Sequence, residues 1–520
     1  MNIYANEFGV EPNKNVALDI CELLGCLKNY NGRNTVIFDK GTYYIDSNNI
    51  KQRREYITNT VGDREFEQDI MPHDNKFALN IDDIEDMVFD FCGSELIIKG
   101  PMSNMIVKKC KNVVIKNLAI DVYEPRFRKL TVVKKSTFYI DFECDGRFII
   151  NQNHGLFLMN YEWNDYCASD KLKNASHIGM VKAKSPDIIK RTYKLFHNVL
   201  SWKKINNTTF RFYYPYTGFC DVGDKFYIFD SRRENVGIFV NQSENITFEN
   251  VSQHFNYSLA FVAQDSKDIT VRNCRFAPKE NSGRDVASLA DFMQICMCRG
   301  NILIENNYFE GACDDCINIH GINYIIESIK GNKIMLLYKH PQTHGFNPIS
   351  VGDKVAFVKP SSLKDQGTAT VINSNLVREY HLEITVDSTD GAKEGYAVED
   401  LTKIPQTTFR NNTVKRIITR GVLVTAREKT VIENNHFISC SMSGVLISDD
   451  ASSWYESGCC KDVLIKDNVF DYCGKVPILI KPENKIDEGA VHSNIRIINN
   501  KFNYKGNPVK IKSAENVVIE

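Results

Sequence analysis

GNILIENNYF (residues 300–309) alternates apolar and polar side chains and then passes through two asparagines to an aromatic residue. Alternation with a period of two is typical of a β-strand with one buried face. The pattern recurs as KNVVIKNLAID (111–121), ENITFENVSQH (244–254), KDITVRNCRF (267–276), KTVIENNHF (429–437), KDVLIKDNVF (461–470) and NIRIINNKF (494–502). Self-similarity at intervals of roughly 22 to 33 residues predicts a solenoid.

A second short apolar strand lies between consecutive copies of this repeat. Its copies read GIFVNQ, LAFVAQ, CINIHG, GVLVTA, GVLISD, PILIKP and PVKIKS. Two or more strands per coil with apolar side chains turned inward describe a right-handed parallel β-helix, in which each coil buries its face only against its neighbours. The fold class predicted for this chain is therefore all-β, of the pectin-lyase-like kind.

Paired asparagines recur at one turn of the coil, at residues 306–307, 434–435 and 499–500. Asparagine tolerates a left-handed backbone and bonds the nearby main chain, so we expect these side chains to be structural. An amphipathic helix is predicted over about residues 15–28, before the first repeat. We expect it to cap the solenoid, because the first coil would otherwise expose its core and its edge strands.

Two long gaps interrupt the repeat and contain strand-rich inserts. Each insert carries the same turn before an alternating strand, in VGDKFYIF (222–229) and VGDKVAFV (351–358). The shared turn predicts two related small antiparallel β-barrels looped out of the solenoid, where inserts often build a binding face. The predicted division is a cap with the first coils (1–124), barrel one (125–235), central coils with the active site (236–321), barrel two (322–405) and C-terminal coils (406–520).

The composition is that of a large soluble globular protein, with 520 residues, 43% hydrophobic residues and a net charge of −1. This balance gives no electrostatic signature for nucleic acid or an acidic membrane, and no apolar run has the length of a membrane span. No signal peptide is visible before the capping segment, which predicts a cytoplasmic protein unless the start was trimmed. The 16 cysteines lack zinc spacing and are interpreted as reduced, buried small residues.

The stretch SLADFMQICMCRGNILIENNYFEGACDDCINIHG (288–321) carries the candidate chemistry. Asp291 precedes the strand FMQICM, and Asp314 and Asp315 precede CINIH one coil later. Neighbouring strands lie about 4.8 Å apart, so these acids should be close. Like charges side by side raise at least one carboxyl pKa, which provides the acid and the base that glycosidic-bond hydrolysis requires. Turn capping and Ca²⁺ binding are the alternative roles for such aspartates.

Asp314 and Asp315 pose a geometric difficulty, because consecutive residues on a regular strand face opposite sides of the sheet. Both carboxylates reach one site only if they lie on a bend. The sequence Gly311-Ala312-Cys313 immediately before them favours such a bend.

The motif DD-x-x-x-x-HG, with an aspartate one coil earlier in a β-helix, resembles the polygalacturonase-type arrangement. The chain more closely resembles glycoside hydrolase family 110, the inverting exo-α-galactosidases that act on terminal α-1,3-linked galactose, including the blood-group B determinant. The likeness spans most of the chain. It is carried by ADFMQI, CRGNILIENNYFEGACDDCINIHG, RGVLVTAR (420–427), SWYESG (453–458) and the two inserts.

This resemblance implies roles for the three acids. Asp314 would donate a proton to the leaving oxygen, while Asp291 and Asp315 would orient and deprotonate water on the opposite face of the sugar. The partner would be an oligosaccharide with a terminal α-linked galactose, and neither a metal nor another cofactor would be needed. The resemblance also points to a homodimer.

Six further side chains are candidates for substrate contact, each with a structural alternative: His320, Arg420, Arg427, Trp454, Glu456 and His254. Histidine, arginine and glutamate near the acids would bond sugar hydroxyls, and a tryptophan would stack on the apolar face of a sugar. The alternatives are core histidines, charges at coil corners and simple loop packing. Asp449 and Asp450 have no partner one coil below, so we interpret them as turn residues or rim contacts.

Two other classes of function stay open. A galacturonide hydrolase or a Ca²⁺-dependent pectate lyase should line its groove with Lys and Arg for the substrate carboxylates, but near the acids the sequence offers only Arg284, Arg299 and little else. The other class is a β-helix that binds glycans without catalysis. An Asp314→Asn change would then leave binding and stability intact, with no activity to lose.

Overall fold

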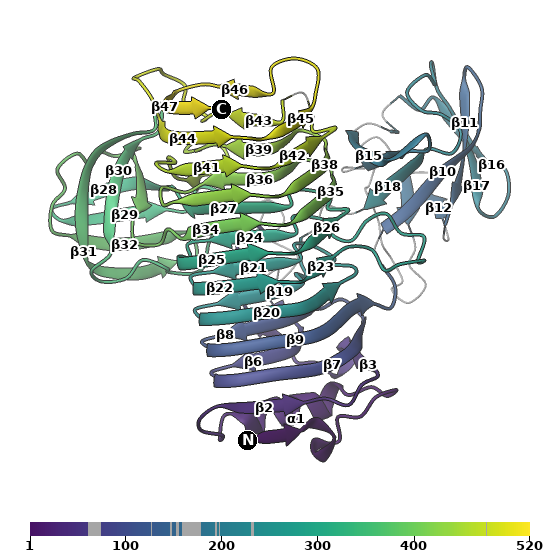
Figure 1. The fold of residues 1–520 in the computed structure, drawn as a ribbon, viewed down its shortest axis with the longest axis horizontal. Coiled ribbons are helices and arrows are strands. Elements are labelled where there is room, and N and C mark those ends of the chain that lie inside the picture. The colour runs from purple at the N-terminus through teal and green to yellow at the C-terminus, as the bar shows by residue number, and fades with distance from the viewer. Residues whose placement is uncertain are drawn as a thin grey trace.

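The computed structural model is a stack of coils with one strand-rich insert on either side, and the N- and C-termini lie at opposite ends of the stack (Figure 1). Among the described residues, helix is confined to η1 (Ala5–Phe8), α1 (Ala17–Leu27) and η2 (Ser47–Asn49), and the other elements are strands. The predicted all-β class is thus confirmed. The structure describes residues 1–60, 74–125, 127–145, 148–151, 155–158, 178–192, 195–196, 198–229, 233–474 and 476–520.

The repeat strands of successive coils pair in parallel and form a 19-stranded sheet. Ile246 lies opposite Ile269, for example, so apolar residues of one repeat stack on those of the next. The strands are β1 (Asn2–Tyr4), β2 (Asn34–Ile37), β3 (Thr42–Asp46), β7 (Glu85–Lys99), β9 (Lys111–Val122), β20 (Glu244–Gln253), β22 (Lys267–Arg272), β23 (Arg275–Phe276), β25 (Arg299–Glu305), β26 (Tyr308–Glu310), β34 (Gln406–Arg410), β35 (Thr413–Ile417), β37 (Thr430–Glu433), β38 (His436–Cys440), β41 (Val463–Lys466), β42 (Val469–Asp471), β44 (His492–Ile498), β45 (Lys501–Asn503) and β47 (Ala514–Ile519).

The second strand of each coil belongs to an 11-stranded sheet, which forms the other wall of the stack. Every second-strand copy quoted from the sequence lies in it. Its parallel members are β6 (Phe77–Asp82), β8 (Ser103–Lys108), β19 (Ile238–Asn241), β21 (Phe261–Gln264), β24 (Met293–Cys296), β27 (Ile317–Ile322), β36 (Arg420–Thr425), β39 (Ser443–Ile447), β43 (Ile478–Ile480) and β46 (Val509–Ile511). The short strand β40 (Glu456–Ser457) pairs antiparallel with β27.

Asparagines form a buried ladder at one turn of the coil, as the sequence predicted. The side chain of Asn435 donates to the carbonyl oxygen of Phe409 (2.9 Å) and to Oδ1 of Asn468 (2.9 Å). Asn307, Asn412 and Asn468 make equivalent contacts to the next coil. The preceding residue in the turn adopts positive φ at Asn306 (57°), Asn434 (54°) and Asn499 (52°). The ladder therefore satisfies main-chain groups that the turn would otherwise leave unpaired inside the protein.

Phenylalanines stack on one another inside the coils. The ring centroids of Phe409 and Phe437 lie 6.3 Å apart, those of Phe437 and Phe470 4.9 Å apart, and those of Phe470 and Phe502 5.2 Å apart. Phe437, Phe470 and Phe502 each follow an asparagine of the ladder by two positions, so the period of the repeat places these three rings above one another. The N-terminal helix α1 closes this core with Ile20, Leu23 and other residues of its apolar face.

The two inserts differ in form. The second, residues 324–400, is a closed barrel of β28 (Tyr324–Lys330), β29 (Lys333–Leu337), β32 (His381–Val386), β31 (Lys364–Arg378), β30 (Lys354–Lys359) and β33 (Ala397–Asp400). The first contains a seven-stranded antiparallel sheet of β15 (Ser185–Thr192), β14 (Ile178–Lys182), β18 (Lys225–Phe229), β10 (Phe127–Lys135), β11 (Tyr139–Cys144), β17 (Thr209–Tyr213) and β16 (Ser201–Lys204), and the hairpin of β12 (Phe148–Asn151) and β13 (Gly155–Leu158). Residues 159–177 of the first insert lie outside the described residues.

Both inserts are joined to the coils by polar contacts. Asp285 accepts from Lys225 Nζ of the first insert (3.0 Å) and pairs with Arg416 of the stack (3.0 Å). The second insert contacts the segment that follows β4 (Arg53–Arg54), the strand that pairs with β5 (Asp74–Asn75), because Tyr56 donates to Glu379 (2.5 Å). The inserts are therefore held against the coils by specific contacts.

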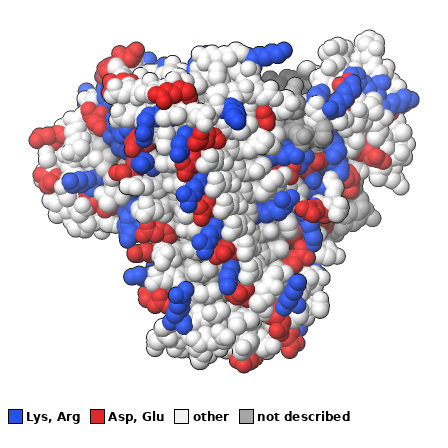
Figure 2. Space-filling model, in the orientation of Figure 1, with Lys and Arg blue, Asp and Glu red and all other residues white. Residues whose placement is uncertain are grey.

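The surface mixes both signs of charge. On the face shown in Figure 2, Lys and Arg alternate with Asp and Glu along the coils, and cross-coil ion pairs such as Lys466–Glu433 (3.2 Å) account for part of this pattern. The described cysteines are all free thiols. No helix in the described part of the chain combines the length and the apolar character needed to cross a bilayer.

Candidate active site

Asp291 and Asp315 occupy corresponding positions on adjacent coils. Met293 lies opposite Ile317 in the pairing of β24 with β27, so the two acids stand at the same distance before their strands. The amide of Phe292 donates to the carbonyl oxygen of Asp315 (2.9 Å), and the amide of Asp315 donates to Oδ1 of Asp291 (3.3 Å). The structure thus brings together the carboxyl groups that the repeat spacing singled out.

Asp314 joins them because residues 313–316 form a bend before β27 begins at Ile317. The hydroxyl of Thr419, on the following coil, bonds Oδ1 of Asp314 (3.3 Å) and also Oδ1 of Asp315, so both carboxylates lie on the same side. Gly311 begins this bend with φ of 87°, and a Cβ there would lie 2.5 Å from the carbonyl oxygen of Asp285. The bend expected from the sequence is therefore present.

Two arginines hold two of the three acids. Arg233 Nη2 lies 2.5 Å from Oδ2 of Asp314. Arg420 grips Asp315 through Nε and Nη2, both at 2.8 Å, and through its amide at 3.0 Å. A forked guanidinium contact of this kind fixes both the position and the charge of the carboxylate.

Of the arginines named from the sequence, the candidate Arg420 lies at the acids, whereas Arg284 and Arg299 do not. Arg284 pairs with Asp121 (2.6 Å), and Arg299 is exposed at the start of β25 in the other sheet. The second arginine at the site, Arg233, comes from the end of the first insert, 81 residues before Asp314. Nearness in sequence to the acids was therefore a poor guide to which cations contact them.

No group of three or more His, Cys, Asp and Glu side chains in the described ranges is arranged to hold a metal ion. The Ca²⁺ alternative for the three acids is addressed by the chelator experiment below.

Burial and mutual repulsion govern the protonation of the acids. Asp291 is only 4% exposed, and burial, followed by the charges of Asp314 and Asp315, raises its pKa well above the ordinary value. Burial also raises the pKa of Asp315, although Arg420 opposes this shift. Burial and the neighbouring carboxylates therefore favour the protonated form of Asp291.

An Asp291→Asn variant is expected to be more stable than the parent chain at neutral pH. In the parent chain the pKa of Asp291 is raised above the ordinary 3.8, so the folded chain binds this proton more tightly than the unfolded chain. Burial of the carboxyl therefore costs nothing below that ordinary value and costs progressively more as the pH rises above it. The gain in Tm should be near zero at about pH 4 and increase toward about pH 8 in thermal unfolding. A gain independent of pH would contradict this account.

Glu456 and His320 form the wall next to the acids. Glu456 belongs to β40, which pairs with β27 and so places this side chain beside that strand. Its Oε1 accepts from Asn318 (3.0 Å) and from Asn59 (3.3 Å). His320 Nε2 lies 3.9 Å from the same oxygen. The charge of Glu456 also acts on Asp291, which places this wall beside the acids.

Trp454 lies at the rim of this wall and is 49% exposed. Its ring stacks on His340 of the second insert, with centroids 4.9 Å apart and planes at 23°. Burial lowers the pKa of His340 to about 4, so the stacked pair is neutral at physiological pH. A small pocket is lined by His320, Ile322, Tyr338, Lys339, His340, Thr343, Trp454, Tyr455 and Glu456.

The structure does not place Arg427 or His254 with the acids. Arg427 pairs with Asp365 (2.7 Å) and Glu399 (2.6 Å), which fastens the second insert to the coils. His254 bonds the carbonyl oxygen of Ala277 (3.1 Å), and its charged neighbours are Asp121 and Arg284.

The acidic pair after β39 divides into a turn residue and a buried one. Asp450 caps the turn that carries Trp454, whose amide donates to it (2.8 Å), and it is therefore a turn residue, one of the two roles interpreted from the sequence. Asp449 accepts from Asn323 (3.4 Å), and burial raises its pKa well above the ordinary value.

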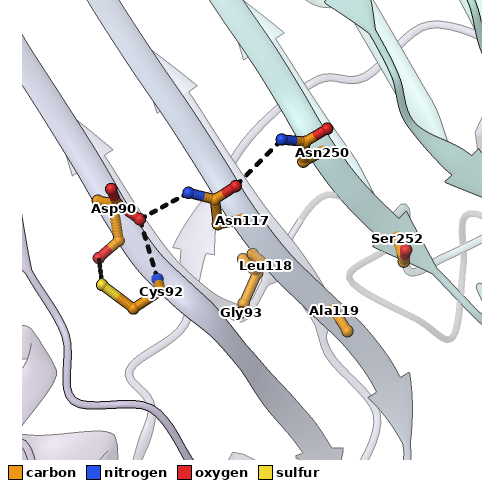
Figure 3. A pocket seen from close by; sticks show the side chains of 8 residues that line it. All are labelled: Asp90, Cys92, Gly93, Asn117, Leu118, Ala119, Asn250 and Ser252. Carbon is orange, nitrogen blue, oxygen red and sulfur yellow. Dashed lines mark hydrogen bonds between the residues drawn. The ribbon is translucent and has the colours of Figure 1, made fainter.

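A wide, shallow depression of about 620 Å³ lies elsewhere, on the outer face of β7, β9 and β20 (Figure 3). Its polar groups satisfy one another, because Asn117 donates to Asp90 (2.8 Å) and Asn250 donates to Asn117 (3.1 Å). This ladder explains the depression as a structural feature of the outer surface, so the candidate site remains the acidic cluster on the other sheet.

Several polar residues at the site were not identified from the sequence. Gln294 and Asn318 interrupt the apolar strands FMQICM and CINIH, which is a signal that could have found them. Thr419 directly precedes Arg420 and carried no separate signal. Arg233 and Asn59 approach from distant segments, so only tertiary structure shows them.

Known proteins resemble this chain over most of its length. Residues 333–398 match the family described as GLAA-B beta-barrel domain II. Alpha-1,3-galactosidase A of Bacteroides thetaiotaomicron is 32% identical over 515 residues, which cover 97% of this chain and 88% of that protein. The protein of the same name from Bacteroides fragilis is 31% identical over 535 residues, covering 98% and 84%. Among solved structures, an exopolygalacturonase from Thermotoga maritima aligns over 100% of this chain and 92% of its own, with 10% identity and a TM-score of 0.42. On this identity over nearly its full length, the chain belongs to the α-1,3-galactosidase family.

Proposed function

We propose that this chain is an exo-acting glycoside hydrolase that removes terminal α-1,3-linked galactose from oligosaccharides, with inversion at the anomeric carbon. Relatives that match nearly the whole chain carry the name α-1,3-galactosidase. The observation that carries the proposal is the meeting of Asp291, Asp314 and Asp315 on adjacent coils, because paired carboxyl groups are what hydrolysis of a glycosidic bond requires.

In the proposed reaction, water attacks the anomeric carbon while the bond to the glycosidic oxygen breaks. Asp291 and Asp315 orient this water and take its proton, and Asp314 gives a proton to the departing oxygen. Arg420 keeps Asp315 ionised and fixed in place. Inverting enzymes keep acid and base about 6.5–9.5 Å apart, which leaves room for the water.

The contact between Arg233 and Asp314 sets a condition on this reaction. A guanidinium at 2.5 Å favours the ionised form of Asp314, whereas the proposed donor must carry a proton when the bond breaks. We therefore propose that sugar binding draws Arg233 away from Asp314 and that the proton held by Asp291 in the empty site then moves to Asp314.

The test is to follow product release by NMR with α-1,3-galactosyl oligosaccharides and aryl α-galactosides as substrates. Inversion predicts that β-galactose forms first and converts to the α-anomer only by slow mutarotation. Initial α-galactose would contradict inversion, and release of an unsaturated uronide from polygalacturonate would overturn the hydrolase assignment in favour of a lyase.

The same experiment includes a comparison of two kinds of substrate and a treatment with a chelator. Linear α-galactosyl and fucosylated blood-group B oligosaccharides are compared, because the proposal covers both acceptor types. A chelator such as EDTA is expected to leave the rate unchanged. A loss of activity that Ca²⁺ restores would show that the acids work through a cation.

A further inference from the structure

Gln294 and Asn318 form a polar strip beside the acids. They lie directly opposite one another on β24 and β27. Their neighbours Ile295 and Ile317 point into the apolar core, so the two amide side chains point outward from the coils, on the side of the sheet that Glu456 covers. Neither amide belongs to the hydrophobic core, although both are buried, with Gln294 at 0% and Asn318 at 4% exposure.

The hydrogen bonds of Gln294 leave its carbonyl oxygen unpaired. His320 Nδ1 lies 2.7 Å from the carbonyl oxygen of Gly321, which can only accept, so Nδ1 carries the ring proton in the neutral imidazole. His320 Nε2 then accepts from the amide nitrogen of Gln294 (2.5 Å). Oε1 of Gln294 has no partner among the described residues.

Asn318 likewise uses its amide nitrogen as a donor while its side-chain oxygen has no partner among the described residues. The amide nitrogen donates to Glu456 Oε1 (3.0 Å). A buried acceptor without a partner is unfavourable, and these two oxygens belong to residues that lie directly opposite one another on β24 and β27. The pair of oxygens therefore indicates a ligand that supplies hydroxyl donors.

The charge of the surroundings restricts this ligand further. Four carboxyl groups (Asp291, Asp314, Asp315 and Glu456) face two arginines, Arg233 and Arg420, and both arginines already contact an aspartate. A ligand carboxylate would meet acceptors and negative charge without a free cation to pair with among these residues. Like charges brought together in this way disfavour binding.

We propose that Gln294, Asn318 and Glu456 form an acceptor wall of the sugar subsite, which binds hydroxyl groups of a neutral galactosyl residue and excludes a sugar with a carboxylate at C6. The inference rests on the proposed function. It assigns the preference for galactosides over galacturonides to three residues on one wall.

The test compares 4-nitrophenyl α-galactoside with 4-nitrophenyl α-galacturonide in the parent chain and in a Glu456→Gln variant. Glutamine keeps the oxygen that accepts from Asn318 and Asn59 but removes the charge. The kcat/KM for the galactoside is expected to fall roughly 10- to 100-fold, as for a lost hydrogen bond to a charged group. The ratio of the two kcat/KM values should shrink at least tenfold, because the variant lacks one of the four carboxylates that repel the galacturonide.

The matched control is Glu433→Gln, which removes a carboxylate from the outer face of β37, where Glu433 pairs with Lys466. It should change neither kcat/KM. A Glu456→Gln variant that folds, as judged by its thermal unfolding, and keeps the parent ratio of the two substrates would overturn the inference. A parent chain without activity on any α-galactoside would instead overturn the proposed function.

A binding measurement keeps the inference testable if Glu456→Gln does not fold. In an Asp314→Asn variant, which keeps the wall intact, galactose and galacturonate are titrated separately and followed by ligand-observed NMR. Galactose is expected to bind at least tenfold more tightly than galacturonate at pH 7. Equal affinity, or tighter binding of galacturonate, would contradict an acceptor wall.

Discussion

In an Asp314→Asn variant, hydrolysis of an α-1,3-galactosyl oligosaccharide is expected to fall roughly 10²- to 10⁴-fold, the usual contribution of a general acid. The sugar leaving group is a poor one and depends on a proton from the enzyme. Asparagine keeps the shape of the side chain and an oxygen that can face Arg233 and Thr419, so the bend at residues 313–316 should persist.

The leaving group separates the roles of the three acids. With a 2,4-dinitrophenyl α-galactoside, whose leaving group needs no proton, the Asp314→Asn variant should recover most of its rate. An Asp291→Asn variant should lose activity on both substrates, because it lacks part of the base that activates water. The measurement is kcat for each substrate and variant. The ratio of two kcat values gives the difference in the activation free energy of the reaction.

Asp400→Asn is the matched control for these variants. Burial and the neighbouring Asp353 raise the pKa of Asp400 to about 8, but this carboxyl lies in β33 of the second insert, and its described bonds are to Thr402 and Lys403. It should change neither rate. If Asp291→Asn, rather than Asp314→Asn, were the variant rescued by the dinitrophenyl substrate, the proton donor would be Asp291 and the proposed transfer to Asp314 would be wrong.

The repeat allowed the coils and the acids to be predicted from the sequence. In a parallel stack each residue lies over the residue one repeat away, so a local pattern also gives long-range contacts. This is why Asp291 could be placed beside Asp315 and why the asparagine ladder could be predicted. The bend that brings in Asp314 was predictable because Gly311 lies just before it.

Distance along a strand explains why Arg420 and Arg427, which looked equivalent in RGVLVTAR, have different roles. Arg420 begins β36 at the end where the acids lie, and Arg427 follows the strand's last residue, Thr425. At about 3.3 Å per residue the two arginines are roughly 20 Å apart in an extended chain. The acids precede the second strands of their coils, so the site lies at the start of this strand, beside Arg420 and away from Arg427.

The other site residues come from segments that leave the coils and return. Arg233 follows the first insert, Asn59 belongs to the segment after β4, and His340 extends from the second insert. Their docking depends on contacts such as Thr58–Thr343 (3.1 Å) and Tyr56–Glu379 (2.5 Å), which join residues more than 280 positions apart. No periodicity governs such contacts, so these residues could not be placed from the sequence.

A Phe437→Ala variant is expected to be about 3–5 kcal/mol less stable than the parent, as for the loss of a phenylalanine from a close-packed core. Its ring is fully buried between those of Phe409 and Phe470, so truncation leaves a cavity in the middle of the stack. Neighbouring coils cannot collapse into this space, because their main chains are fixed by the parallel sheets on either side. Denaturant unfolding followed by circular dichroism measures the loss.

The same variant is also expected to lose activity per folded molecule, although Phe437 belongs to the hydrophobic core of the stack. A Cβ placed on Gly421 would lie 2.6 Å from Phe437 Cδ1, so this ring supports the backbone directly beside Arg420. A cavity there would let Arg420 and the carboxylate of Asp315 shift, and a displacement of about 1 Å can cost roughly 10²-fold in rate.

Phe502→Ala is the matched control for the coupling between core and site. Phe502 belongs to the same stack, but it lies near the C-terminal end, is only partly buried and has Phe470 as its described stacking partner. Its loss should cost less stability and leave kcat unchanged. If both variants lowered kcat equally, general loosening of the coils would explain the effect. A reduced kcat confined to Phe437→Ala would show that the core positions Asp315 through Gly421 and Arg420.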